Sequence, residues 1–268
     1  SGVNRISLGV QSFEDDELKM MNRIHNASQG LKAIEWTSKV FDNFSVDLIY
    51  GLPQSNISSW ADNLDTLISF KPPHISSYAL TVEPKTLLSY QVEKGEVKLL
   101  DEETVKFQYD LLISRLEKES YINYEFSNFG KFGFHSVNNS NYWRGKPYLG
   151  IGPSAHSFDG HRLRSWNISN NLKYLKSIEK GYLPQTKEVL KDHEVFNEYV
   201  MIGLRTNGVK IRGVNEYFGS NYVVFLEKQV KKHLLSRSLF WDGDVLKVSR
   251  HARFLTDGIA SDLFMLRG

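Results

Sequence analysis

Short β-branched runs alternate with longer amphipathic segments along the first eighty residues of the chain. The runs cover residues 3–10, 45–51 and 74–80. The segments between them place apolar residues three and four positions apart, which is the spacing of a helix that buries one face. A strand followed by a helix, repeated in this way, predicts an α/β fold with a parallel sheet and right-handed crossovers.

The amphipathic segments predict helices with defined buried sides. Asp15 and Asp16 begin the first helix, where acidic side chains suit the helix dipole. A strand is expected over residues 121–126. The residues expected to face inward are Leu31, Ile34 and Val40 in the helix from Ser28, Leu64, Leu67 and Ile68 in the helix over residues 59–70, and Val105, Leu112, Ile113 and Leu116 in the helix over residues 101–119.

The second half of the chain has a different pattern. Residues 127–168 are rich in Asn, Gly and aromatic residues and are expected to form loops, followed by a short helix over residues 170–180. Three helices are then predicted after Pro184, with a hairpin that turns at Asp242-Gly243 and a closing helix. This is the element order of a winged-helix domain, so we expect a boundary between residues 1–184 and 185–268.

Only three strand–helix units are present, whereas a closed parallel barrel needs six to eight. The sequence also starts within a predicted strand. We therefore expect a C-terminal fragment whose earlier strand–helix units are absent.

Composition narrows the classes of function. The 268 residues contain 33 Lys and Arg, 31 Asp and Glu, and no cysteine. The balanced charge argues against a dedicated polyanion binder. The absence of cysteine excludes disulfides, thiolate nucleophiles, cysteine-bound zinc and an iron–sulfur cluster held by this chain's own thiolates. We expect no membrane span and no signal peptide, because no apolar run approaches the required length.

Polar residues lie where the predicted parallel strands end, which is where such sheets hold their ligands. Gln11 follows the first strand, and Asp47 lies within the apolar second strand. A carboxylate there suits a ribose diol or an amino group, and Arg23 is placed to pair with a carboxylate. Alternatively, Asp47 caps a neighbouring backbone and Arg23 is a surface charge. Ser76 and Ser77 lie in the third strand, and Thr81 directly follows it.

Three patterns in the second half of the sequence have competing interpretations. Gly150-x-Gly152-x-x-Ala155 matches a dinucleotide fingerprint formally, but the strand and acidic residue that such sites need are missing, so a tight turn is favoured. His156 lies among aromatic residues that include Tyr142 and Trp143; the group either holds a flat macrocycle or packs as an aromatic loop. The basic cluster around Lys231 is either a DNA-binding surface or a solvated helix face.

Several longer motifs resemble the radical S-adenosylmethionine proteins related to oxygen-independent coproporphyrinogen III oxidase, and most closely their HemW branch of haem-chaperone relatives. The motifs are NRISLGVQSF, MNRIH, VDLIYGLPQ, PHISSYALTVEP, YEFSNF, YLGIGPSAHSF, EYVMIGLRT and LTDGIASD. The resemblance implies an incomplete (β/α)6 barrel followed by a small winged-helix-like domain. It also implies that Gln11, Arg23 and Asp47 bind S-adenosylmethionine.

The sequence departs from the family in two places. The cluster-binding cysteine motif is missing, so the [4Fe–4S] cluster that the family implies has no ligands in this chain. The family's His-Asn-x-x-Tyr-Trp motif, linked to haem binding, is represented by Asn138-Asn139-Ser140-Asn141-Tyr142-Trp143. An amide replaces the imidazole, so His135 and His156, with Tyr142 and Trp143, become the candidates for binding haem or a related substrate.

The resemblance therefore implies a cytoplasmic protein of haem metabolism, a HemW-like chaperone that binds haem, S-adenosylmethionine and a [4Fe–4S] cluster when full length. A haem-acceptor protein is the implied partner, and the isolated chain should be inactive. The alternative is the oxidase itself, which decarboxylates coproporphyrinogen III to protoporphyrinogen IX. A third interpretation is a winged-helix protein that interacts with nucleic acid, which the mixed charge of the domain disfavours.

Overall fold

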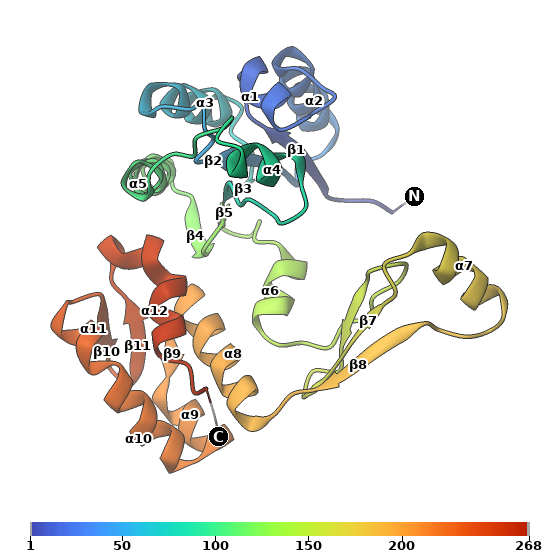
Figure 1. Ribbon diagram of the computed structural model, residues 1–268. Coiled ribbons are helices and arrows are strands. Elements are labelled where there is room, and N and C mark those ends of the chain that lie inside the picture. Colours follow the sequence, from blue (N-terminus) through green and yellow to red (C-terminus); the bar gives the residue numbers. More distant parts are fainter. Residues whose placement is uncertain (1, 267–268) are drawn as a thin grey trace. The chain divides into compact units, whose positions relative to one another are not determined.

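The computed structural model describes residues 2–266, which fall into two compact units. The first unit is Ser1–Ser136 and the second is Val137–Gly268 (Figure 1). Each unit has its own sheet or sheets and is described separately.

The first unit is built on a five-stranded sheet in the order β1-β2-β3-β5-β4. The pairs β1–β2 and β2–β3 are parallel, as predicted, whereas β5 pairs antiparallel with both β3 and β4. The predicted strand over residues 121–126 therefore exists but forms a hairpin, so the sheet is mixed. The strands are β1 (Ile6–Gln11), β2 (Phe44–Tyr50), β3 (His74–Ala79), β4 (Ile122–Glu125) and β5 (Asn128–Gly130).

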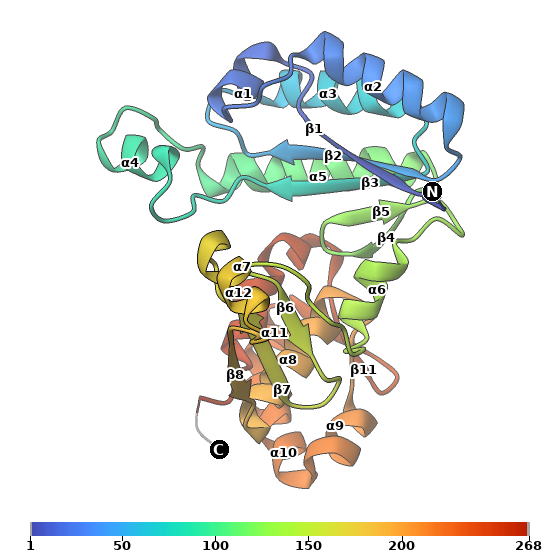
Figure 2. The same cartoon turned by 90° about the vertical axis from the view of Figure 1, so that its right-hand side faces the viewer.

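Helices cover one face of this sheet. Figure 2 shows α2 and α3 along the same side of β1 and β2, and α5 packs on α3 and contacts β2. The buried side chains Val46, Leu48 and Tyr50 of β2 alternate with Ser45 and Asp47. The helices are α1 (Asp15–Met20), α2 (Ala27–Val40), α3 (Ile57–Ser69), α4 (Leu87–Glu93) and α5 (Glu102–Lys118).

The predicted inward-facing residues are largely confirmed. Ile34, Leu64, Leu67, Leu112, Ile113 and Leu116 are all buried. Val40 is a wrong prediction: it is the last residue of α2 and its side chain is 74% exposed. Asn26 caps the first turn of α2: its Oδ1 accepts a hydrogen bond from the Gln29 backbone amide, and its own backbone amide donates to Gln29 Oε1.

The second unit begins with structure that the sequence pattern did not predict. Residues 127–168 were expected to form loops, but they contain β5, a helix and two strands of an antiparallel sheet with the order β6-β7-β8. The predicted helix over residues 170–180 is confirmed as α7. These elements are α6 (Val137–Trp143), β6 (His156–Phe158), β7 (Leu163–Asn167), α7 (Asn171–Glu179) and β8 (Gln185–Val189).

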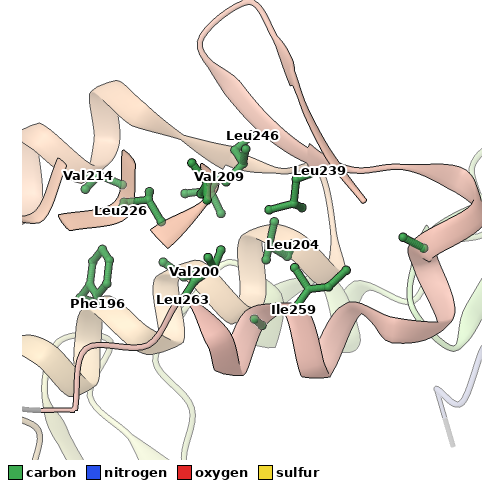
Figure 3. Packing of buried hydrophobic residues seen from close by; sticks show 13 residues of the cluster. Phe196, Val200, Leu204, Val209, Val214, Leu226, Leu239, Leu246, Ile259 and Leu263 are labelled. Atoms are coloured by element: carbon green, nitrogen blue, oxygen red, sulfur yellow. The ribbon is translucent and has the colours of Figure 1, made fainter. Parts of the chain in front are cut away.

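The rest of the second unit follows the predicted order of helices, hairpin and closing helix. Its hydrophobic core gathers residues from nearly every element, with Phe196 and Val200 of α8 facing Leu226, Leu246 and their neighbours (Figure 3). The elements are α8 (Asp192–Arg205), β9 (Val209–Lys210), α9 (Ile211–Phe218), α10 (Ser220–Gln229), α11 (Lys231–Leu235), β10 (Leu239–Asp242), β11 (Val245–Val248), the 3-10 helix η1 (Arg250–Leu255) and α12 (Thr256–Asp262).

Among the residues that the structure describes, no helix is both long and apolar enough to cross a membrane.

Candidate functional site

Polar side chains form two rows across the face of the first unit's sheet opposite to the buried face of β2. Register pairs Ser7 with Ser45, Ser45 with His74, and His74 with Gly130, which makes the first row. The strand period of two residues places these side chains on one face. Four consecutive strands thus align polar or small residues at the same level.

The second row lies two residues further along the parallel strands. Register pairs Asp47 with Ser76 and Ser76 with Asn128. The Ser76 hydroxyl donates to Asn128 Oδ1 at 2.8 Å, and Asn128 in turn donates to Glu125. Ser76, Asn128 and Glu125 are buried, so this row forms a polar lining with its hydrogen bonds satisfied.

Asp47 is the carboxylate of this surface. Its oxygens accept hydrogen bonds from Ser7 Oγ at 3.2 and 3.3 Å and from Ser45 Oγ at 3.3 Å. Burial raises the pKa of Asp47, while the serine hydroxyls and the nearby Arg5 guanidinium act in the opposite direction. A half-buried carboxylate that keeps hydroxyl donors on one side is suited to accept hydrogen bonds from a ligand on the other.

Gln11 and Arg23 meet over Gly9. A Cβ atom at Gly9 would lie 2.8 Å from Gln11 Nε2 and 3.4 Å from Arg23 Nη2, so the missing side chain makes room for both groups. Arg23 Nη2 donates to the Gly9 carbonyl at 3.1 Å. Gln11 has a φ of +71°, and the pairing of β1 with β2 is irregular between Leu8 and Gln11. The strand β1 thus ends at Gln11, whose left-handed backbone accompanies the placement of its side chain beside Arg23.

His74 connects the first row to the antiparallel hairpin. Its Nδ1 lies 2.7 Å from Ser45 Oγ and its Nε2 lies 2.7 Å from the Tyr124 hydroxyl. The side chain is 1% exposed. Burial, followed by the charges of Arg5 and His135, lowers the pKa of His74 to about 3. His74 is therefore a neutral imidazole at physiological pH.

His135 also belongs to this unit. Its ring stacks on Tyr124 with centroids 4.2 Å apart, and its Nε2 is buried without a hydrogen-bond partner in the part of the chain that the structure describes. Gly130 makes this possible, since a Cβ there would lie 2.8 Å from His135 Cδ2. Burial lowers the pKa of His135. The imidazole nitrogen is thus turned into the protein.

The other haem candidates lie in the second unit. Tyr142 packs edge-on against Tyr148 with centroids 4.7 Å apart, and the Arg205 guanidinium lies 5.9 Å from the Trp143 ring centre. Tyr148 exchanges two backbone hydrogen bonds with Phe158 of β6, each 3.0 Å long. The aromatic residues of α6 are thereby linked to the three-stranded sheet.

His156 lines a cavity of about 520 Å³ in the second unit. Its ring stacks on Trp166 across the β6–β7 pair, with centroids 6.1 Å apart and planes 28° from parallel. Tyr182, Ile168 and Pro184 also line the cavity, together with Ser154, Asn167, Ser169, Gln185 and Thr186. The exposed imidazole beside two aromatic walls can receive a flat ligand.

The structure therefore brings Gln11 and Arg23 together and places Asp47 on the polar face of the same sheet. It divides the haem candidates: His135 lies in the first unit, and Tyr142, Trp143 and His156 lie in the second. The fingerprint at Gly150 is a tight turn packed on β6, because a Cβ at Gly150 would lie 2.1 Å from the His156 carbonyl oxygen.

Sequence reasoning missed Ser7, Ser45 and His74. All three precede the strand ends on which the search concentrated, and His74 looked like the first residue of an apolar strand. The available signal was the period of two, since Ser45 and Asp47 share a face, as do His74 and Ser76.

Comparison with known proteins gives the class of this fold. Residues 1–67 match the family described as "Radical SAM superfamily". A solved structure, the coproporphyrinogen III oxidase HemN from Escherichia coli, superimposes with a TM-score of 0.80 over 99% of this chain and 65% of its own, at 18% identity. The likeness to HemN is one of fold. The first unit's strand and helix order is thus that of a radical S-adenosylmethionine barrel.

Curated relatives narrow the family. The protein named "Heme chaperone HemW" from Haemophilus influenzae is 39% identical over 99% of this chain and 68% of its own length. The HemW of Bacillus subtilis is 34% identical over 82% of this chain and 58% of its own length. The chain belongs to the HemW family of radical S-adenosylmethionine proteins, and it spans 58% and 68% of the length of these two relatives.

Proposed function

We propose that this chain serves haem delivery as a HemW-like chaperone in the cytoplasm, with S-adenosylmethionine bound by the first unit and haem bound by the second. The observation that supports the first part is the convergence of Gln11 and Arg23 over Gly9, on a sheet whose polar face holds Asp47. The HemW relatives support the second part, because these proteins are named haem chaperones. The proposed partner is a haem-acceptor protein.

The residues of the first unit fit S-adenosylmethionine. Asp47 offers carboxylate oxygens to the ribose hydroxyls, and Arg23 and Gln11 offer charge-assisted and neutral hydrogen bonds to the amino-acid end. When bound, this cofactor would supply a sulfonium group, whose bond to the adenosyl carbon breaks when a reduced iron–sulfur cluster donates an electron. Cluster binding does not fit this chain's own residues, because it contains no cysteine.

The second unit fits a flat macrocycle. His156 is exposed, lies against Trp166 and borders a cavity that also contains Tyr182. A neutral imidazole nitrogen is a common axial ligand of haem iron, and aromatic walls stack on the macrocycle. His135 is the weaker candidate, because its Nε2 is buried between structural elements. His156 is therefore the residue that would hold the haem iron.

Isothermal titration calorimetry with S-adenosylhomocysteine tests the first unit. Replacing Asp47 with Ala should weaken binding by about 1–3 kcal/mol, the range for losing hydrogen bonds that involve a charged group. The exposed Asp42 provides the matched control, and Asp42→Ala should bind as tightly as the unmodified chain. Equal affinity in all three proteins would contradict the role of Asp47.

A haem titration followed by the Soret band tests the second unit. His156→Ala should shift or abolish the band, whereas His161→Ala, a change at an exposed histidine in the same hairpin, should leave it unchanged. His135→Ala should also leave it unchanged. Loss of the band in His135→Ala alone would transfer the ligand to the first unit.

The oxidase alternative has its own test. Supplied with the cluster-binding part, the protein would be incubated anaerobically with coproporphyrinogen III, and formation of protoporphyrinogen IX would contradict the chaperone proposal. The nucleic-acid interpretation has little support in the structure. Lys232 and His233, which follow Lys231 in the basic cluster, contact Asp262 at 2.8 and 3.1 Å. The Asp262 carboxylate offsets part of the positive charge of the cluster.

A further inference from the structure

The polar face of the first unit contains an unbroken series of hydrogen bonds that ends on Asp47. It starts at the backbone amide of Ser136, which donates to the Tyr124 hydroxyl at 3.2 Å. The Tyr124 hydroxyl lies 2.7 Å from His74 Nε2, and His74 Nδ1 lies 2.7 Å from Ser45 Oγ. Ser45 Oγ then donates to Asp47 Oδ1 at 3.3 Å.

The direction of each bond follows from counting hydrogens. The Ser136 amide can only donate, so the Tyr124 oxygen accepts there and has one hydrogen of its own. Among the residues that the structure describes, His74 Nε2 is the one acceptor within reach of that hydrogen. If Nε2 accepts, a neutral His74 must have its proton on Nδ1, and Nδ1 must donate to Ser45.

The opposite tautomer of His74 leaves the Tyr124 hydroxyl hydrogen without an acceptor in this series. With the proton on Nε2, the Tyr124 oxygen would accept twice, and its own hydrogen would lack an acceptor among the described residues, which is unfavourable at this half-buried position. Ser45 would then give its hydrogen to His74 Nδ1 and none to Asp47. The tautomer with Nδ1–H is therefore the one that satisfies every donor in the series.

His74 also restricts the Ser45 hydroxyl. That hydroxyl has two acceptors at the same distance, Asp47 Oδ1 and Ser76 Oγ, both at 3.3 Å. The carboxylate is the stronger acceptor once the lone pairs of Ser45 are engaged by the imidazole, because charge-assisted hydrogen bonds are roughly twice as strong as neutral ones.

We propose that His74 is a positioning residue for Asp47: its Nδ1–H fixes the Ser45 hydroxyl so that the hydroxyl hydrogen points to the carboxylate. This orients Asp47 Oδ1 toward Ser45 and Ser7 and leaves the remaining lone pairs for a vicinal diol such as that of ribose. The inference rests on the proposed binding of S-adenosylmethionine for its ligand, but the orientation itself belongs to the protein alone.

The charged and titratable groups around His74 are compatible with this role. Arg5 and His135 both lower its pKa, whereas its hydrogen-bond partners are Ser45 and Tyr124. Burial raises the pKa of Tyr124 to about 12, so the phenol keeps its hydrogen at physiological pH. Asp47 is the one carboxylate in direct hydrogen-bond connection with the series among the described residues.

The tautomer is tested without any ligand. Long-range ¹⁵N–¹H correlation spectra of the chain should show Nδ1 of His74 as the protonated nitrogen and Nε2 as the bare one. The opposite assignment would overturn the proposal. The carboxyl carbon of Asp47, followed as a function of pH, should titrate at a higher pH in His74→Phe than in the unmodified chain.

A double-mutant cycle tests the consequence for binding. His74→Phe should weaken S-adenosylhomocysteine binding about fivefold, the effect of one oriented hydrogen bond. In the Asp47→Asn background the same substitution should change nothing, because there is no carboxylate left to orient. His74→Asn, whose amide nitrogen can take the place of Nδ1–H, should restore most of the affinity.

The outcomes separate the two proposals. Equal losses from His74→Phe in both backgrounds, or no loss in either, would show that His74 does not act through Asp47. If the unmodified chain binds no S-adenosylhomocysteine, the proposed function fails, whereas the tautomer and the Asp47 titration still decide whether His74 positions the carboxylate.

Discussion

Acid should destabilise the first unit through His74. The pKa of this histidine falls from 6.5 to about 3 on folding, because burial penalises the imidazolium. The unfolded chain therefore binds a proton at His74 below pH 6.5, whereas the folded chain binds it only near pH 3. The contribution of His74 to the free energy of unfolding is fully present above pH 6.5 and is lost as the pH falls toward 3.

The size of the effect follows from the two pKa values. Between pH 7 and pH 5, proton binding to the unfolded histidine lowers the free energy of unfolding by about 2 kcal/mol, since each pH unit well below 6.5 contributes about 1.4 kcal/mol. With a urea dependence of roughly 2 kcal/mol per molar, the unfolding midpoint should fall by about 1 M.

This loss of unfolding free energy can be measured by hydrogen exchange at increasing urea concentrations, with mass spectrometry reporting on the peptides that contain β2 and β3. Other groups also respond to acid: burial raises the pKa of Asp47 and Glu17, so these two stabilise the folded chain as the pH falls. Comparison of His74→Phe with its parent, both in the Asp47→Asn background, removes the Asp47 contribution and cancels that of Glu17. The reasoning is refuted if the two proteins lose the same stability between pH 7 and pH 5.

Two further predictions concern packing and the loop after β2. Phe196→Ala should lower the free energy of unfolding of the second unit by about 3–5 kcal/mol, because the ring is fully buried against Phe218, Tyr222 and Phe225. The same hydrogen-exchange measurement, followed in peptides from α8 as urea is increased, gives this loss, and a value below about 1 kcal/mol would contradict the packing. Gln108→Ala should lower the free energy of unfolding of the first unit by about 2–3 kcal/mol, because the buried side-chain amide accepts a hydrogen bond from the Gly51 backbone amide and donates one to Ser55. An unchanged hydrogen-exchange rate at the Gly51 amide would show that this bond is dispensable.

The parts of the fold that the sequence predicted are those whose periodicity reflects burial. Ile34, Leu64 and Leu112 recur at helical spacing because one side of each helix packs on the sheet. Val40 fits the same spacing but ends its helix, where the chain leaves the sheet, so periodicity alone misassigned it.

The sheet β6-β7-β8 could not be predicted in this way. The residues of β8, QTKEV, are all partly or fully exposed, so the strand lacks the buried face that produces an alternating pattern. Its pairing with β7 is held by the backbone ladder from Leu163 with Val189 to Asn167 with Gln185. Backbone hydrogen bonds leave little trace in side-chain hydrophobicity.

The same distinction, between what side-chain patterns show and what requires the paired strands, applies to the candidate site. Gln11 and Asp47 could be predicted because ligand-binding residues gather at the ends of parallel strands. His74 could not, because its partners Ser45 and Tyr124 come from other strands and become neighbours only when the register is known. Sequence spacing identifies the residues at a strand end, whereas a hydrogen-bond series across strands requires the paired structure.

The left-handed backbone at Gln11 sets protein stability against the ligand binding that we propose for its side chain. Glycine adopts that conformation without steric penalty, whereas glutamine pays about 1 kcal/mol for it. Gln11→Gly should therefore raise the melting temperature of the chain and weaken its binding of S-adenosylhomocysteine, so that the two requirements on this residue oppose each other.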